Sequence, residues 1–239
     1  MDKHKPRYKI VFLTGAGVSK ESGIPTYSDA TDNYYHNVNP EILSWGSAFD
    51  AKPQDVLDFY NERRLQLFHA QPNHAHKVIA ELEKDYDVVV ITQNVDNLHE
   101  RAGSTNVIHT HGELTKVTSS RYRTCLDFIQ DYPLDKPINV GDKALDGSQL
   151  RPYVVFMDEY VSSMRLPEKH IKEADIFVII GTSLRIGAGT VLYYKAHPYI
   201  PKFIIDPCDY TERLPEGFIW IPLPATQGID VLTEKLKEL

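Results

Sequence analysis

The sequence predicts an α/β fold, in which strands alternate with helices to form a doubly wound parallel sheet, with a small inserted second domain. Three observations support this prediction. Apolar runs of strand length recur along the chain, separated by segments with helical spacing. The runs are apolar throughout, as in DVVVIT at 87–92, which is typical of central parallel strands buried on both faces. One stretch, 113–150, has only short β-prone runs among Pro, Gly, Asp and Lys, and we interpret it as the insertion.

Composition limits the classes of function. A length of 239 residues suffices for one large domain, or for a large and a small one. The net charge of −7 gives no basic footprint, so nucleic acid is not expected as a partner. No apolar run approaches the length needed to cross a bilayer, and MDKHKPRYK leads directly into a strand. We therefore expect a cytoplasmic protein without a membrane partner; nothing in the sequence indicates its oligomeric state.

The N-terminal stretch from Lys9 to Asp29 begins the predicted sheet. An apolar strand is followed by a turn with Gly15, Ala16 and Gly17, and then by Ser19 and a possible helix start. Glycines let a backbone approach a phosphate closely, and the N–H groups at a helix start attract anions. An ordinary strand-to-helix turn explains the same residues, because the third glycine of the usual dinucleotide fingerprint is missing. Both interpretations stay open on this stretch alone.

Helices are predicted after a polar segment at 30–39, which we expect to be a loop able to cover a ligand. Helical spacing runs from 40 to 82, with Pro53 and Pro72 as punctuation, and a second helix is expected at 74–83. The periodic positions of the first pattern are Val56, Leu57, Tyr60, Arg63, Arg64 and Leu67.

Polar residues follow the ends of several predicted strands. In open α/β sheets, ligands bind beyond the carboxyl ends of the strands, so such residues are candidates for chemistry. Further strands are expected at 107–110, 153–157, 176–180 and 202–205, and helices at 188–195 and 229–239. The polar residues at strand ends are Gln93, Asn94, Asp96, Asn97 and His99 after 87–92, His111 after 107–110, Gly181, Thr182 and Ser183 after 176–180, and Asp206 after 202–205.

Each of these residues also has an ordinary structural explanation. His111 could act as a general base, because the unperturbed pKa of histidine lies near neutrality, or it could simply precede the turn at Gly112. Asp96 could contact a ligand, form an Asx turn or cap a helix. Asp206 could accept hydrogen bonds from ribose hydroxyls or form a turn before Pro207.

Metal and nucleophile chemistry have little support. The pairs His74/His76 and His109/His111 lack further ligands nearby in the sequence, and there is no Cys-x-x-Cys pair. The sequence also lacks the Gly-x-Ser-x-Gly motif of serine hydrolases. No metal site is predicted.

A series of motifs resembles the sirtuins, which are NAD-dependent protein-lysine deacylases. The motifs occur in the family's order and span nearly the whole chain: GAGVSKESGIP, TQNVDNLHERAG, the HG of HTHGEL, RPYVV, GTSL and QGIDVL. The resemblance implies a Rossmann-like NAD-binding domain formed by 1–30, 85–112 and 151–239. It also implies a helical insertion at 31–84 and a small zinc-module-like insertion at 113–150, with the acyl-lysine peptide bound in the cleft between the two parts.

The resemblance also implies roles for individual residues. His111 would be the general base, with Asn94 and Asp96 as further catalytic residues that line the nicotinamide pocket. The backbone at 154–159 would pair with the substrate as an added strand. Cofactor-binding residues would be Gly15, Ala16, Gly17, Ser19, Tyr27, Gln93, Asn94, Asp96, Gly181, Thr182, Ser183, Asp206, Gly228 and Ile229, and substrate-binding residues would be Tyr60, Arg63, Val154, Phe156, Met157 and Glu159.

Tyr60 and Arg63 resemble the Tyr-x-x-Arg pair of sirtuins that accept acidic acyl groups such as succinyl. One helical turn separates the two, so a hydroxyl and a guanidinium lie on one face. The expected reaction is desuccinylation and demalonylation, and also deacetylation, of protein lysines, with release of nicotinamide and O-acyl-ADP-ribose. A solvated arginine on an amphipathic helix is the alternative for this pair.

Three departures from the family are apparent. The stretch 113–150 has only Cys125 where the family carries two Cys-x-x-Cys pairs, so zinc is not expected. Tyr27-Ser28 replaces the family's Phe-Arg, and Met157-Asp158-Glu159 replaces its Phe-Gly-Glu. These changes leave two alternatives open: an NAD glycohydrolase or ADP-ribosyltransferase on the same fold, or a non-catalytic sensor of NAD or ADP-ribose.

Overall fold

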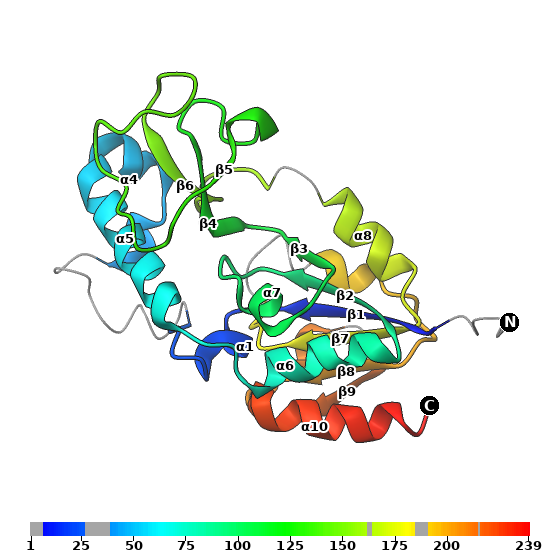
Figure 1. Ribbon diagram of the computed structural model, residues 1–239. Coiled ribbons are helices and arrows are strands. Elements are labelled where there is room, and N and C mark those ends of the chain that lie inside the picture. Colours follow the sequence, from blue (N-terminus) through cyan, green and yellow to red (C-terminus); the bar gives the residue numbers. More distant parts are fainter. Residues whose placement is uncertain (1–6, 27–38, 162–163, 185–190, 215) are drawn as a thin grey trace, which may run out of the picture.

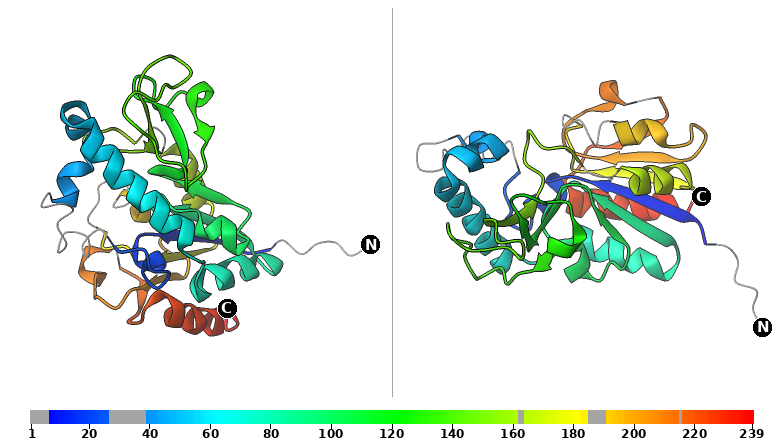
Figure 2. Two further views of the ribbon diagram at one scale, coloured as in Figure 1. Left: turned by 60° about the vertical axis from the view of Figure 1, so that its left-hand side comes forward. Right: turned by 90° about the horizontal axis from the view of Figure 1, so that it is seen from above.

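A computed structural model describes residues 7–26, 39–161, 164–184, 191–214 and 216–239. The chain forms two parts, one built on a six-stranded sheet and the other on a three-stranded sheet with helices (Figure 1). The two parts can also be distinguished in views from two further directions (Figure 2). The predicted α/β class, with a small second part, is confirmed.

The large sheet is parallel throughout and has the strand order β3-β2-β1-β7-β8-β9. The chain moves outward from β1 through β2 to β3, and later returns to place β7 on the other side of β1. In open α/β sheets a ligand-binding crevice is expected at such a reversal, here at the carboxyl ends of β1 and β7. The strands are β1 (Lys9–Thr14), β2 (Asp87–Thr92), β3 (Val107–His109), β7 (Ile176–Ile180), β8 (Lys202–Ile205) and β9 (Phe218–Ile221).

Helices cover both faces of this sheet, because alternate strand residues point to opposite sides. Ile10 and Phe12 of β1 pack in one core cluster with α6 (His74–Glu81) and α10 (Ala225–Leu236). Val11 and Leu13 pack in another with α8 (Arg165–Lys172). Figure 1 shows α6 and α10 on one side of the sheet and α8 on the other. The short helices α1 (Gly17–Lys20) and α7 (Leu98–Ala102) follow the ends of β1 and β2.

The small part combines an antiparallel sheet, of order β5-β4-β6, with helices from the described stretch 40–69. A separate apolar cluster joins them, formed by residues such as Phe49, Leu57, Val117 and Phe156. The elements are α3 (Pro40–Leu43), α4 (Gly46–Ala51), α5 (Pro53–His69), β4 (Gly112–Ser119), β5 (Gln130–Asp131) and β6 (Leu150–Val154).

Several elements differ from the sequence prediction. The strand expected at 153–157 forms earlier, as β6, and pairs with β4 in the small sheet instead of joining the large one. A short apolar run has the same local pattern in either sheet. The sequence of the run therefore does not show which strand it pairs with. The stretch 113–150, where only short β-prone runs were expected, also contains a 3-10 helix, Leu126–Phe128.

Three further expected elements differ in extent or description. The C-terminal helix begins at Ala225, before the expected 229. Of the helix expected at 188–195, residues 188–190 lie outside the described part of the chain, and Tyr193–Lys195 form a 3-10 helix. The loop expected at 30–39 lies outside it except for its last residue.

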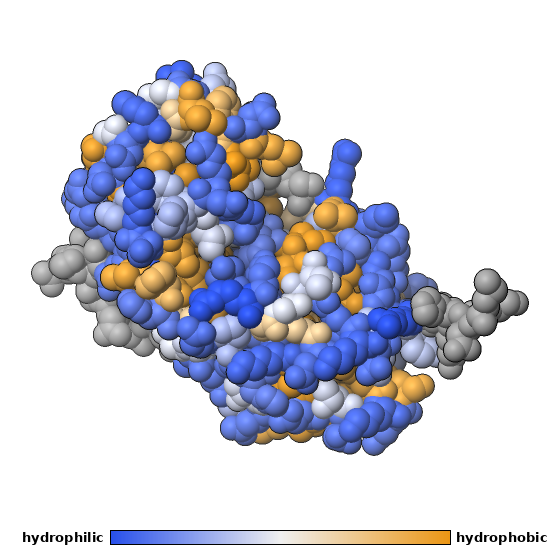
Figure 3. Space-filling view, in the orientation of Figure 1, coloured by the Kyte–Doolittle hydropathy of each residue, from blue (hydrophilic) through white to orange (hydrophobic). Residues whose placement is uncertain are grey.

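The surface is mainly polar on the face drawn in Figure 3, and a notch separates the two lobes there. Within the described ranges, no helix has both the length and the apolar character needed to cross a membrane.

Candidate functional site

The predicted site residues converge where the carboxyl ends of the large sheet face the small part (Figure 1). Gln93 after β2 and Thr182 after β7 are far apart in the sequence, yet the Thr182 Oγ1 hydroxyl donates to Gln93 Oε1 at 2.9 Å. His111 lies between β3 and β4, at the junction of the two parts. The predicted crevice therefore brings together residues from three different strand ends.

The glycine turn after β1 packs against the end of β7. Gly15 N–H donates to Ile180 O at 3.0 Å, and Gly17 N–H donates to Gly181 O at 2.8 Å. A Cβ atom on Gly15 would lie 2.7 Å from Thr182 Cβ, and one on Gly17 would lie 2.6 Å from Gly181 Cα. The close packing of the two backbones is enough to explain why both positions are glycine. Contact of this turn with a phosphate therefore stays a prediction.

A buried polar cluster lies just beyond this turn and joins Ser19, Asn94 and Asp96. Ser19 Oγ donates to Asp96 Oδ2 at 2.9 Å and accepts from Asn94 Nδ2 at 3.1 Å. Asp96 Oδ1 also accepts from Leu98 N–H, two residues further on, at 3.1 Å, which is the Asx-turn arrangement just before α7. Burial raises the pKa of Asp96, and hydrogen bonds from Leu98 and Ser19 offset this only in part. Three predicted residues form one hydrogen-bonded unit here.

Two buried histidines lie next to this cluster: His99, one of the polar residues that follow the strand at 87–92, and His76, which was not predicted as part of the site. His76 Nε2 lies 3.5 Å from Ser19 Oγ, and His99 Nε2 lies 3.2 Å from Thr14 Oγ1. Their rings are 4.7 Å apart. Burial lowers the pKa of His76 to about 4 and that of His99 well below its ordinary value, so both are neutral near pH 7. His76 occurs on a helix face beside apolar residues, where sequence alone does not distinguish a polar neighbour of a site from core.

His111 has the tautomer that a base requires. Its Nδ1 lies 2.9 Å from Gln93 O, and because a carbonyl only accepts, Nδ1 carries the proton. The lone pair of the neutral ring is therefore on Nε2. Burial lowers the pKa of His111, and the bond to the carbonyl opposes this only in part. The ring can thus accept a proton at Nε2 near neutral pH.

His109, two residues earlier, differs in charge. It donates from Nδ1 to Asn94 O at 3.0 Å, and its Nε2 lies 2.7 Å from Glu100 Oε1. Burial would lower the pKa of His109, but the hydrogen bond and charge of Glu100 outweigh burial and raise it. Ligand atoms of Glu100, His109 and Glu113 lie within 4.8 Å of one another. Each carboxylate already pairs with a cationic side chain, Glu100 with His109 and Glu113 with Lys116, so ion pairing accounts for the group.

Three of the predicted cofactor residues, Asp206, Gly228 and Ile229, lie at β8 and α10. Asp206 Oδ1 accepts from Cys208 N–H at 2.9 Å, which is the turn arrangement considered as its alternative role. Burial raises the pKa of Asp206. A Cβ atom on Gly228 would lie 2.2 Å from Ile205 Cγ2, so α10 approaches β8 closely there. The Ile229 side chain is fully buried in the core, so only its main chain is left to contact a ligand.

The predicted substrate residues lie in the small part. The Tyr60 ring of α5 packs against Phe156 at 5.5 Å between centroids, and the Arg63 guanidinium lies 4.6 Å from the centre of the Phe59 ring. Val154 ends β6 and pairs with Gly112 of the neighbouring strand. Of the remaining predicted substrate residues, Met157 is exposed and Glu159 is bound by Arg151. Two predicted cofactor residues complete the set: Ser183, after β7, has a carbonyl that accepts from Arg213, and Tyr27 lies outside the described residues.

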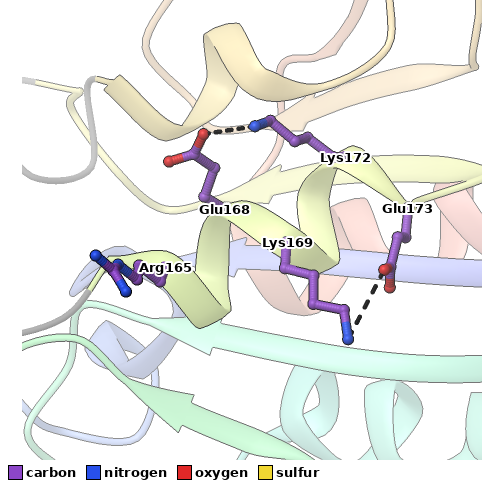
Figure 4. A pocket seen from close by; sticks show the side chains of 5 residues that line it. All are labelled: Arg165, Glu168, Lys169, Lys172 and Glu173. Atoms are coloured by element: carbon purple, nitrogen blue, oxygen red, sulfur yellow. Dashed lines mark ion pairs between the residues drawn. The ribbon is translucent and has the colours of Figure 1, made fainter.

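A separate charged hollow on α8 lies away from this site. Figure 4 shows its lining, in which Glu168 pairs with Lys172 and Lys169 pairs with Glu173. Glu173 also accepts from Lys9 Nζ, at the start of β1, at 3.1 Å. One lining residue therefore contacts the amino end of the sheet, opposite the candidate site.

Comparisons with known proteins agree on one family. A model of the Sir2 family matches residues 15–188. An NAD-dependent protein deacylase of Bacteroides thetaiotaomicron is 41% identical over 95% of this chain and 97% of its own. One of Helicobacter pylori is 42% identical over 96% of this chain and 98% of its own. A crystal structure of a Sir2 homologue in complex with NAD superposes with a TM-score of 0.81 at 32% identity, covering 97% of this chain and 90% of that one.

Proposed function

The chain belongs to the Sir2 family, and we propose that it is an NAD-dependent protein-lysine deacylase that releases nicotinamide and O-acyl-ADP-ribose. The observation that carries this proposal is the state of His111, a neutral ring fixed at Nδ1 and placed at the junction of the two parts. A sensor that only binds NAD has no need of such a base.

The groups at the strand ends fit NAD by their chemistry. The glycine turn and Thr182 would hold the pyrophosphate, Gln93 the nicotinamide ribose, and Asn94 and Asp96 the nicotinamide. When bound, NAD supplies the ADP-ribosyl group that receives the acyl chain, with nicotinamide as the leaving group. The Ser19 hydroxyl supports this assignment, because its bonds to Asn94 and Asp96 fix both amide and carboxyl before any ligand arrives.

His111 would accept a proton at Nε2 from a ribose hydroxyl. The bond from Nδ1 to Gln93 O keeps the ring oriented and the lone pair on the other nitrogen. Gln93 would also contact the nicotinamide ribose. The same residue would therefore orient the His111 ring and position the ribose hydroxyl that gives up its proton.

The acyl-lysine peptide would bind along 154–159, between the two parts. A peptide that pairs by main-chain hydrogen bonds is recognised with little dependence on its sequence, which suits an enzyme that acts on many proteins. Met157 is exposed on this segment, and Phe156 beneath it packs on Tyr60. The acyl chain would therefore enter beside α5.

We further propose a preference for succinyl and malonyl groups. Tyr60 and Arg63 lie one turn apart on α5, and Tyr60 contacts Phe156 of the proposed substrate segment. A guanidinium can bind a carboxylate through two hydrogen bonds. Succinyl and malonyl groups carry such a carboxylate, and an acetyl group does not. With NAD and matched peptides, succinyl- and malonyl-lysine should be turned over faster than acetyl-lysine.

Arg63→Ala tests this preference in the same assay. The variant should lose about tenfold or more in kcat/KM for succinyl-lysine, as for loss of one charge-assisted contact, while acetyl-lysine turnover persists. Glu62→Ala, an exposed neighbour on α5, is the matched control. Equal losses on both acyl groups would refute the preference, and absence of turnover with every peptide in the wild type would refute the deacylase itself.

A second candidate is an NAD glycohydrolase or ADP-ribosyltransferase. The substitution of Met157-Asp158 for the family's Phe-Gly favours it, because these residues lie on the proposed peptide segment. Nicotinamide release at the same rate with and without acyl peptide would support this candidate.

A further inference from the structure

Asp158 bridges the proposed substrate segment to the start of α4. Its Oδ1 accepts from Gly46 N–H at 2.6 Å and its Oδ2 accepts from Ser47 N–H at 3.0 Å. These are the first two residues of α4, whose N–H groups have no partner within the helix. Trp45, at the N-cap position, makes no side-chain capping bond, so a residue more than 110 positions away supplies the cap.

The position opposite Asp158 is adapted to it. A Cβ atom on Gly46 would lie 3.0 Å from Asp158 Oδ1, which is closer than an ordinary contact. A third bond strengthens the bridge, since Met157 N–H donates to Ser44 O at 2.9 Å. Burial would raise the pKa of Asp158, but the bonds from Gly46 and Ser47 lower it overall, so the carboxylate is ionised at neutral pH.

The same segment is also held by Glu159, the residue that follows Asp158. This carboxylate pairs with Arg151 at 2.6 Å and accepts from Phe156 N–H at 2.8 Å. Arg123 Nε lies 3.3 Å from it. The segment is thus fixed to the small sheet through Glu159 and to α4 through Asp158, which orders its backbone before a peptide binds.

We propose that Asp158 is a positioning residue for the acyl-peptide substrate, which holds the main chain of 155–159 against α4 in the conformation that the peptide pairs with. This inference rests on the proposed function. It assigns a purpose to a residue that departs from the family's glycine. A segment that is already ordered loses less conformational entropy on binding, so the bridge should act on peptide affinity and not on the chemical step.

Steady-state kinetics of Asp158→Ala test the proposal. The KM for acetyl-lysine peptide should rise about three- to tenfold, the range that follows from loss of a helix cap. The kcat and the KM for NAD should stay unchanged, and Asp158→Asn, which keeps one acceptor oxygen, should be intermediate. Asp175→Asn is the matched control, because its carboxylate also accepts a backbone N–H, from Lys9 at 2.8 Å, at the amino end of the sheet.

Hydrogen exchange provides an independent measurement. The amides of Gly46 and Ser47 should exchange faster in Asp158→Ala than in the wild type, and Gly46→Ala should reproduce this by crowding the carboxylate. Unchanged exchange would overturn the bridge, and faster exchange with a peptide KM no different from that of Asp175→Asn would overturn the positioning role. If the wild type turned over no peptide, the proposed function would fail. The affinity for acetyl-lysine peptide, measured directly by calorimetry, would then test Asp158: weaker binding by Asp158→Ala than by Asp175→Asn would support the positioning role, and equal binding would overturn it.

Discussion

At the scale of single residues, His109 and His111 differ in charge although they lie two positions apart. Both donate from Nδ1 to consecutive carbonyls, of Asn94 and Gln93. Glu100 lies 2.7 Å from Nε2 of His109 and raises its pKa, whereas burial dominates at His111 and lowers its pKa. His109 therefore keeps its proton to higher pH than His111, whose neutral ring is the proton acceptor.

His111→Ala should abolish deacylation while NAD binding largely persists. Loss of a general base costs about a hundredfold or more in kcat, but His111 would bind NAD through few contacts. Turnover is measured by nicotinamide release, and NAD affinity by calorimetry. His197→Ala, an exposed histidine before β8, should behave as the wild type. Full activity of the His111 variant would assign the base to another residue.

The contribution of His109 to stability should depend on pH. Its folded-state pKa is raised, so the stabilisation is complete below the unfolded pKa of about 6.5 and is lost as pH rises through the folded pKa. The difference in unfolding free energy between wild type and His109→Gln should be about 1.5 kcal/mol at pH 6, the magnitude of a charged hydrogen bond, and shrink toward alkaline pH. Urea denaturation across this range measures it. A difference that grew with pH would contradict a charged His109.

How far sequence alone could predict the site differs from residue to residue. His111 and Asp96 could be placed, because polar residues at the ends of parallel strands meet at one edge of the sheet. The supporting roles of His76 and His99 could not, because their partners Ser19 and Thr14 come from a distant part of the chain. No local pattern encodes such contacts.

At the scale of elements, the continuous apolar strands were predictable and the small sheet was not. The run at 87–92 forms β2 within the bounds expected, because burial on both faces marks a central strand. The strand β6 was expected in the large sheet, yet it pairs with β4. Pairing depends on which strand the chain brings alongside, and in 113–150 no zinc motif or helix indicated that arrangement.

The close approach of α10 to β8 gives a prediction about stability. Gly228→Ala would place a methyl group 2.2 Å from Ile205 Cγ2, so the helix must shift. We expect a loss of about 1 to 3 kcal/mol in unfolding free energy, as for other overpacked cores. Thermal or urea denaturation measures it, with Gln227→Ala on the exposed face as the control. A variant as stable as the control would show that α10 is not tightly packed there.

At the scale of the whole molecule, two parts with separate cores meet where the proposed chemistry takes place. The large sheet presents Gln93, Thr182 and the buried cluster, and the small part presents Tyr60 and the substrate segment. His111 lies on the chain that connects β3 of one to β4 of the other. This arrangement is suited to a reaction in which two substrates enter from different sides.

Coupling between the two substrates tests the central claim most directly. Wild-type protein is incubated with NAD and succinyl-lysine peptide, and mass spectrometry follows deacylated peptide, nicotinamide and O-acyl-ADP-ribose over time. A deacylase of this family should form the three products in equal amounts, and only when both substrates are present. Nicotinamide formed without peptide, or deacylated peptide formed without NAD, would contradict the account.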